Sequence, residues 1–182
     1  NQKKPHPVFK KHNLNFIPYQ NEKMDHWRNS LTGGISYLDK ETNLKIHGGI
    51  DDIWYDLDKE ELVVVDYKAQ SSKIKVETKA YLNNIYHQGY KIQMDIYVHI
   101  LRKMDFKVSD ISYFYVCNGE KGYDNFEGKL NFTTTLVPYV TNTSWVQDKI
   151  IEMKKTLELG SVPEINRSCE KCMYLYAGKD FI

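Results

Sequence analysis

The chain has 182 residues, 41% of them hydrophobic and 27% charged, a size and composition that suit one globular domain and exclude a disordered or low-complexity protein. Its 25 basic and 24 acidic residues leave a net charge of +1, which excludes a basic field over the whole surface. Nucleic-acid binding would therefore need a local patch, for which the basic stretches 3–12 and 154–157 are candidates, although each also fits ordinary solvated surface.

The first part of the chain predicts extended structure and then strands. Residues 1–21 are polar and interrupted by prolines, and residues 21–31 suit a short helix. Residues 35–69 predict three strands separated by turns at 39–43 and 56–61, which indicates an antiparallel meander.

The second part predicts two helices and two strands. Residues 80–104 carry the best helical pattern, with a continuous face at three- to four-residue spacing. That face consists of Leu82, Tyr86, Tyr90, Gln93, Tyr97, Ile100 and Met104. Strands are expected at 111–117 and 129–140 and a helix at 144–159, followed by an irregular tail. The chain is expected to form one α/β domain of order β-β-β-α-β-β-α.

The stretch 61–70 ends an apolar run with an acid and a base. Its four apolar residues suit a buried strand, in which alternate residues share a face, so Asp66 and Lys68 point the same way and Tyr67 points the other way. Buried charges are rare unless they are paired or bound to a metal. The Asp66–Lys68 pair alone fits either a salt bridge at a strand end or part of a binding site.

Two further acids precede this strand, in the stretch HGGIDDIW. If the strands on either side of the 56–61 turn pair, Asp51 or Asp52 lies near Asp66. Two carboxylates beside a lysine favour a divalent cation such as Mg²⁺ or Mn²⁺. The alternative is that Asp51 and Asp52 only flank a turn.

Gln93 is the one polar member of the long helix's apolar face. An inward glutamine needs hydrogen-bond partners, because burying it without them costs about 1–3 kcal/mol. Tyr97 follows one turn later on the same face. The two side chains could orient ligands at the carboxylate–lysine cluster, or Gln93 could be a satisfied core residue.

These motifs together resemble the PD-(D/E)xK nuclease superfamily. GGIDDI, LVVVDYK and the helical Gln93-Met94-Asp95-Ile96-Tyr97 occur in the order of that superfamily, and the last motif resembles its RecB-like and Cas4-like branch. The resemblance implies a restriction-endonuclease-like core of order α-β-β-β-α-β, with a central mixed sheet flanked by helices. It implies a single domain over 1–182, with the core at about 22–140 and a C-terminal helix and tail at 143–182.

The resemblance also implies roles for individual residues. Asp51 and Asp66 would be metal ligands, with the backbone carbonyl of Tyr67 as a possible third. Lys68 would position or polarise the attacking water and offset charge on the phosphate. Gln93 and Tyr97, the remaining catalytic candidates, would support the site.

Two features of the branch are matched incompletely. His26 lies near the position of the branch's histidine ligand, but its surroundings differ, and a surface or core histidine is the alternative. Relatives often hold an iron–sulfur cluster on four cysteines, whereas this sequence has three, at Cys117, Cys169 and Cys172. We therefore expect no iron–sulfur cluster, and the Cys169–Cys172 pair is open to interpretation as a remnant or a zinc half-site.

The expected activity is that of an Mg²⁺- or Mn²⁺-dependent deoxyribonuclease that hydrolyses DNA phosphodiester bonds. Exonuclease action is one expectation, and the residues leave endonuclease action open. The alternative is a non-catalytic nuclease-fold module that binds nucleic acid or a partner protein. A helicase or another repair or CRISPR protein is a possible partner. No signal peptide or apolar run of about 18 residues is present, which with the odd cysteine count predicts a cytoplasmic protein without a membrane partner.

Overall fold

The computed structural model describes residues 5–121 and 128–178, which form a mixed α/β protein. The elements in chain order are α1 (Pro7–Lys11), β1 (Phe16–Pro18), α2 (Met24–Arg28), β2 (Ile35–Asp39), β3 (Leu44–Gly48), β4 (Asp52–Asp56), β5 (Glu61–Ser71), α3 (Thr78–Asn83), the short 3₁₀ helix η1 (Ile85–His87), α4 (Gln88–Lys103), β6 (Ile111–Gly119), β7 (Phe132–Val140), α5 (Val146–Leu157) and α6 (Glu170–Gly178). The chain divides into two compact units, Asn1–Val146 and Gln147–Ile182, which are described separately.

The first unit is built on a five-stranded sheet of order β1-β4-β5-β6-β7. Only the central pair, β5 and β6, is parallel; the other neighbours run antiparallel. A parallel pair needs a long crossover, and the helices between β5 and β6 provide it. The expected central mixed sheet flanked by helices is confirmed, and the finer restriction-endonuclease-like topology stays a prediction.

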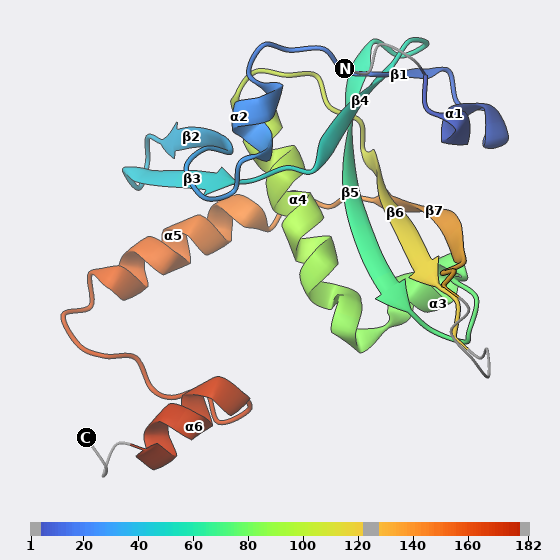
Figure 1. The fold of residues 1–182 in the computed structure, drawn as a ribbon. Coiled ribbons are helices and arrows are strands. Elements are labelled where there is room, and N and C mark those ends of the chain that lie inside the picture. Colours follow the sequence, from blue (N-terminus) through green and yellow to red (C-terminus); the bar gives the residue numbers. More distant parts are fainter. Residues whose placement is uncertain (1–4, 122–127, 179–182) are drawn as a thin grey trace. The chain divides into compact units, whose positions relative to one another are not determined.

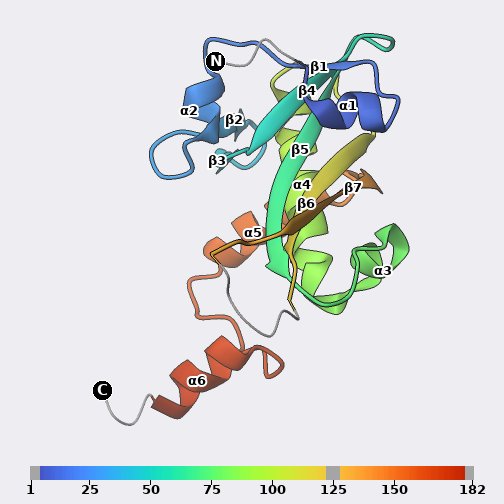
Figure 2. The ribbon, with the colours of Figure 1, turned by 45° about the vertical axis from the view of Figure 1, so that its right-hand side comes forward.

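Each face of the sheet is covered by different elements. On one face, Ile53 of β4 and Val64 of β5 share a buried cluster with Met94 and Val98 of α4. On the other face, Val63 packs in a second cluster to which α1 contributes. Figures 1 and 2 show α4 alongside β5, with α1 on the opposite side of the sheet near β1 and β4. Because successive side chains of β5 point to opposite faces, this strand contributes to both hydrophobic clusters.

The segment 35–69 contains four strands, so the prediction of three was wrong. The chain leaves β3 at Gly48 and enters β4 at Asp52, and β2 and β3 form a separate two-stranded sheet. The break coincides with close packing at Gly49, where a Cβ atom would lie 2.6 Å from Cβ of Ser30. Both predicted turns are present, and β4 pairs with β5 across the second turn as expected.

The predicted helix 80–104 is also interrupted. Asn84 has extended backbone angles and its side chain accepts a hydrogen bond from the N–H of Tyr86, which begins η1. Asparagine competes with helical hydrogen bonding in this way and favours caps over helix interiors. Tyr86 is consequently 87% exposed and does not belong to the inward face. Gln93 and Tyr97 remain together on α4.

The N-terminal segment is more structured than its prolines predict. Pro7 occupies the first turn of α1, where a missing N–H costs nothing, and Nδ1 of His6 accepts a hydrogen bond from the N–H of Val8. Strand β1 then pairs with β4, with Ile17 opposite Tyr55. The expectation of extended chain over 1–21 is therefore wrong for the residues of α1.

The second unit contains helical structure that the sequence did not predict. Helix α5 lies within the expected 144–159 segment, but the tail, predicted to be irregular, forms α6 at Glu170–Gly178. Cys169 precedes α6, and its Sγ accepts a hydrogen bond from the N–H of Cys172 at 3.2 Å. Across the described residues, no helix combines the length and apolar character that crossing a membrane requires.

Candidate metal-dependent active site

The β4–β5 hairpin brings Asp51 to the middle of β5. Asp52 pairs with Val65, so the preceding residue, Asp51, lies beside the segment that begins at Asp66. Oδ2 of Asp51 accepts a hydrogen bond from the backbone N–H of Tyr67 at 2.8 Å. The strand register therefore places Asp51, and not Asp52, beside Asp66 and the Tyr67 N–H, a choice that the sequence left open.

Asp66 and Lys68 form a buried ion pair. Nζ of Lys68 lies 2.6 Å from Oδ2 of Asp66, with 17% and 3% of the two side chains exposed. Burial raises the pKa of Asp66 above its ordinary value, Lys68 opposes that rise, and the nearby charge of Asp51 adds to it. Within the described part of the chain, no hydrogen bond besides this ion pair reaches Oδ2 of Asp66.

Helix α4 completes the surroundings of Lys68. Its Nζ donates a hydrogen bond to Oε1 of Gln93 at 3.2 Å and lies 4.3 Å from the ring centre of Tyr90. Nε2 of Gln93 donates to the hydroxyl of Tyr97 at 2.7 Å. The inward glutamine therefore finds the partners it needs, and it connects the lysine to the tyrosine.

The charges of both carboxylates act on the Tyr97 phenol. Burial is the main cause that raises the pKa of its phenol; Gln93 lowers it, while Asp66 and then Asp51 raise it. The ring also packs against Gly48 at the end of β3, where a Cβ atom would lie 2.7 Å from Cε1 of Tyr97. Glycine at position 48 therefore permits the close approach of this ring.

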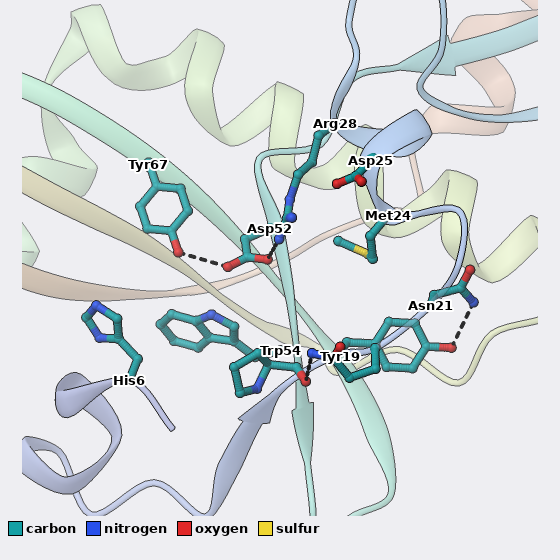
Figure 3. Close-up of a pocket in the computed structure, with 11 residues that line it drawn as sticks. His6, Tyr19, Asn21, Met24, Asp25, Arg28, Asp52, Trp54 and Tyr67 are labelled. Carbon is teal, nitrogen blue, oxygen red and sulfur yellow. Dashed lines mark hydrogen bonds and ion pairs between the residues drawn. The ribbon is translucent and has the colours of Figure 1, made fainter. Parts of the chain in front are cut away.

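Asp52 belongs to the opposite side of the hairpin. Its Oδ1 lies 2.5 Å from Nη2 of Arg28, and its Oδ2 accepts a hydrogen bond from the Tyr67 hydroxyl at 2.9 Å (Figure 3). Nε of Arg28 also donates to the backbone carbonyl of Asp51 at 3.1 Å. Arg28 thereby supports the backbone that carries Asp51, a role for which the sequence gave no signal.

His26 and the cysteines contribute no assembled ligand set. His26 is exposed on α2, and the described residues contain no group of three or more His, Cys, Asp or Glu side chains placed to hold a metal. All three cysteines are free thiols. Ligation by His26 and the absence of an iron–sulfur cluster both stay predictions.

The donor set at Asp51 and Asp66 nevertheless fits one kind of ion. Mg²⁺ takes oxygen ligands and is usually bound by one or two carboxylates, with water and substrate phosphate filling its other positions. Oδ2 of Asp66 is a buried oxygen with capacity for such an ion, since the Lys68 ammonium is its one close partner among the described residues. A soft metal such as copper(I) would find no sulfur ligand in this cluster.

Comparison with known families decides the assignment. The model of the PD-(D/E)XK nuclease superfamily matches residues 4–176. The chain belongs to this superfamily. Comparison with curated proteins and with solved structures gives no match.

The PD-(D/E)XK membership gives the cluster a chemical context. Members are generally phosphodiesterases, most of them nucleases that use divalent metals.

Sequence reasoning gave no role to Tyr90, although its position three residues before Gln93 placed it on the same helical face.

Proposed function

We propose that the chain is a metal-dependent nuclease that hydrolyses DNA phosphodiester bonds. The observation that carries the proposal is the convergence of Asp51, Asp66 and Lys68 from two adjoining strands, closed on one side by Gln93. Superfamily membership supports nuclease chemistry in general. The choice of DNA, and of Mg²⁺ or Mn²⁺, is inferred from the resemblance of the motifs and from the oxygen donor set.

The two carboxylates and the Tyr67 carbonyl are the proposed ligands. Asp51 is oriented by the N–H of Tyr67, and Asp66 is held by its ion pair, so both carboxylates are fixed before an ion enters. A bound divalent cation lowers the pKa of water and stabilises charge on phosphate oxygens. His26 is a further candidate ligand, which would have to reach the cluster from α2.

Lys68 is the proposed cationic group for the phosphate and the attacking water. Its Nζ is shared between Asp66 and Gln93 and has an aromatic ring beside it, which restricts its motion. A fixed positive charge acts strongly where charge develops during reaction, because no reorganisation is needed at that moment. Gln93 and Tyr97 act as positioning residues behind it.

The same helix supports the RecB-like and Cas4-like branch. Gln93 and Tyr97, four residues apart, are joined by a hydrogen bond and face the carboxylates, as a site-supporting motif would require. Met94 between them is fully buried, which anchors this turn of α4. A helicase or another repair or CRISPR protein is the kind of partner that this branch assignment suggests.

A non-catalytic module that binds nucleic acid or a partner protein is the second candidate. It is favoured by a net charge of only +1 and by the exposed position of His26. Such a module would retain DNA without cutting it under any metal condition.

A cleavage assay separates the two candidates. Labelled linear and circular DNA, single- and double-stranded, would be incubated with Mg²⁺, Mn²⁺ or EDTA. The parent chain would be compared with Lys68→Ala and with Lys45→Ala, a matched removal of an exposed lysine on β3. We expect cutting by the parent and by Lys45→Ala with metal only, and its loss in Lys68→Ala. Cutting by Lys68→Ala at the parental rate would overturn the site assignment.

A further inference from the structure

A polar pocket lies on the opposite side of the β4–β5 hairpin from the proposed active site. Its volume is about 440 Å³, which is within the range of about 300–1,000 Å³ typical of small-molecule sites. Asp52, Arg28 and Tyr67 line it on the hairpin side, and Tyr19, Gln20 and Asp25 line it from the chain between β1 and the end of α2 (Figure 3).

The pocket and the catalytic cluster are neighbours through the backbone. Asp51 and Tyr67 are joined by a hydrogen bond in the cluster, while Asp52 and the Tyr67 hydroxyl are joined in the pocket. Consecutive residues of an extended chain point to opposite faces, so the pocket lies across the hairpin from the cluster. Strand β1 pairs with β4 only as far as Trp54, so no strand of the described chain covers the β4 edge at Asp52.

The charges in the pocket disfavour a phosphate group as its occupant. It holds two carboxylates, Asp25 and Asp52, and one guanidinium, Arg28, which is already paired with Asp52. A phosphate would be a third anionic group beside a single guanidinium. A neutral polar group is therefore the better fit.

The open hydrogen-bonding groups point to a nucleobase. Asp25 is exposed and makes no hydrogen bond or ion pair within the described residues, so its carboxylate can accept two donors. Gln20 adds an exposed amide whose Nε2 donates to the Pro18 carbonyl at 3.4 Å, and the Tyr19 ring adds an aromatic surface. Carboxylates accept from the exocyclic amino group of cytosine, amides pair with adenine, and aromatic rings stack on any base. Thymine has no exocyclic amino group.

We propose that this pocket binds one unpaired base of the substrate strand where that strand passes the uncovered β4 edge, and that it prefers adenine or cytosine to thymine. The role of this pocket in cleavage rests on the proposed nuclease function, whereas base binding by the pocket does not. A base in this pocket must leave its stack and its pairing partner, so the substrate is single-stranded or frayed where it passes the pocket.

Nucleotide binding to the full chain tests the proposal without requiring cleavage. dAMP, dCMP and dTMP would be titrated calorimetrically in EDTA, so that all three carry the same phosphate and differ in the base. We expect dCMP and dAMP to bind about tenfold more tightly than dTMP, the ratio that one additional hydrogen bond gives. Asp25→Ala should remove this preference, whereas Glu22→Ala, a nearby exposed acid outside the pocket, should keep it.

The outcomes separate this inference from the proposed function. Equal affinity for the three nucleotides, no binding of any, or a preference that persists in Asp25→Ala would overturn the base pocket. Each of these results can occur whether or not the chain cuts DNA. Absence of cleavage together with the expected nucleotide preference would instead contradict the nuclease and keep the pocket.

Discussion

Replacing Lys68 by methionine should destabilise the protein, and the size of the effect should depend on pH. Methionine keeps the unbranched side chain beside Tyr90 but removes the charge that lies 2.6 Å from Asp66. Removing one partner of a buried pair costs about 3–5 kcal/mol, because the other charge stays buried without compensation. Since 17% of the Lys68 side chain is exposed and water screens part of the interaction, we expect a loss of about 2–4 kcal/mol in the free energy of unfolding at pH 7.5.

The pH dependence follows from the raised pKa of Asp66. Burial makes the folded-state pKa higher than the unfolded value, so the ionised carboxylate is a cost to folding at pH values above the folded pKa. That cost disappears as the pH falls through the folded pKa and Asp66 takes up a proton. Without Lys68, which lowers this pKa, the relief should begin at a higher pH than in the parent.

Urea unfolding followed by tryptophan fluorescence, in EDTA at pH 7.5 and pH 5, measures both effects. The difference between parent and Lys68→Met should shrink at the lower pH. Adding Asp66→Asn to Lys68→Met removes the uncompensated charge and should restore most of the lost stability at pH 7.5. A loss below about 1 kcal/mol, or a double variant no more stable than Lys68→Met, would refute the buried-pair reasoning.

Three further substitutions test other contacts of the site and its supports. Gly48→Ala places a Cβ atom 2.7 Å from the buried Tyr97 ring and should cost about 1–3 kcal/mol in urea unfolding. Gly89→Ala on α4, where a Cβ atom would meet nothing within 4 Å beyond its chain neighbours and the helix's own backbone, should not destabilise. Gln93→Ala releases the site lysine and should lower kcat for DNA cleavage about 10- to 100-fold; an unchanged kcat would argue against a positioning role. Asp95→Ala removes the carboxylate that accepts three hydrogen bonds of 3.0 Å and should cost about 3 kcal/mol, and a loss below 1 kcal/mol would contradict that anchoring role.

The parts of the site that were predictable depend on local periodicity. The alternation of a strand placed Asp66 and Lys68 on one side and Tyr67 on the other, and the helical repeat placed Gln93 and Tyr97 together; the contacts of all five follow this arrangement. These patterns are fixed by backbone geometry and do not require knowledge of distant neighbours.

The features that were missed depend on distant neighbours or on short segments. The parallel pairing of β5 with β6 is set by the crossover through α4, and no local pattern in Ile111–Gly119 distinguishes it from antiparallel pairing. The division of 35–69 into four strands coincides with close approaches at the glycine pair, where Ser30 and Tyr97 come from other parts of the chain. Helix α1 has five residues, too few for a periodic signal to appear.

The most direct test of the account is the rate of DNA cleavage as a function of free Mn²⁺, measured for the parent and for Asp51→Asn. The account predicts no cleavage in EDTA, cleavage that rises and saturates with Mn²⁺ for the parent, and a curve displaced to higher Mn²⁺ or abolished for Asp51→Asn. The Asp51 carboxylate accepts a hydrogen bond from the Tyr67 N–H, and asparagine keeps the shape of this side chain but removes its charge. Cleavage in EDTA, or identical Mn²⁺ curves for the two chains, would contradict a metal site at Asp51.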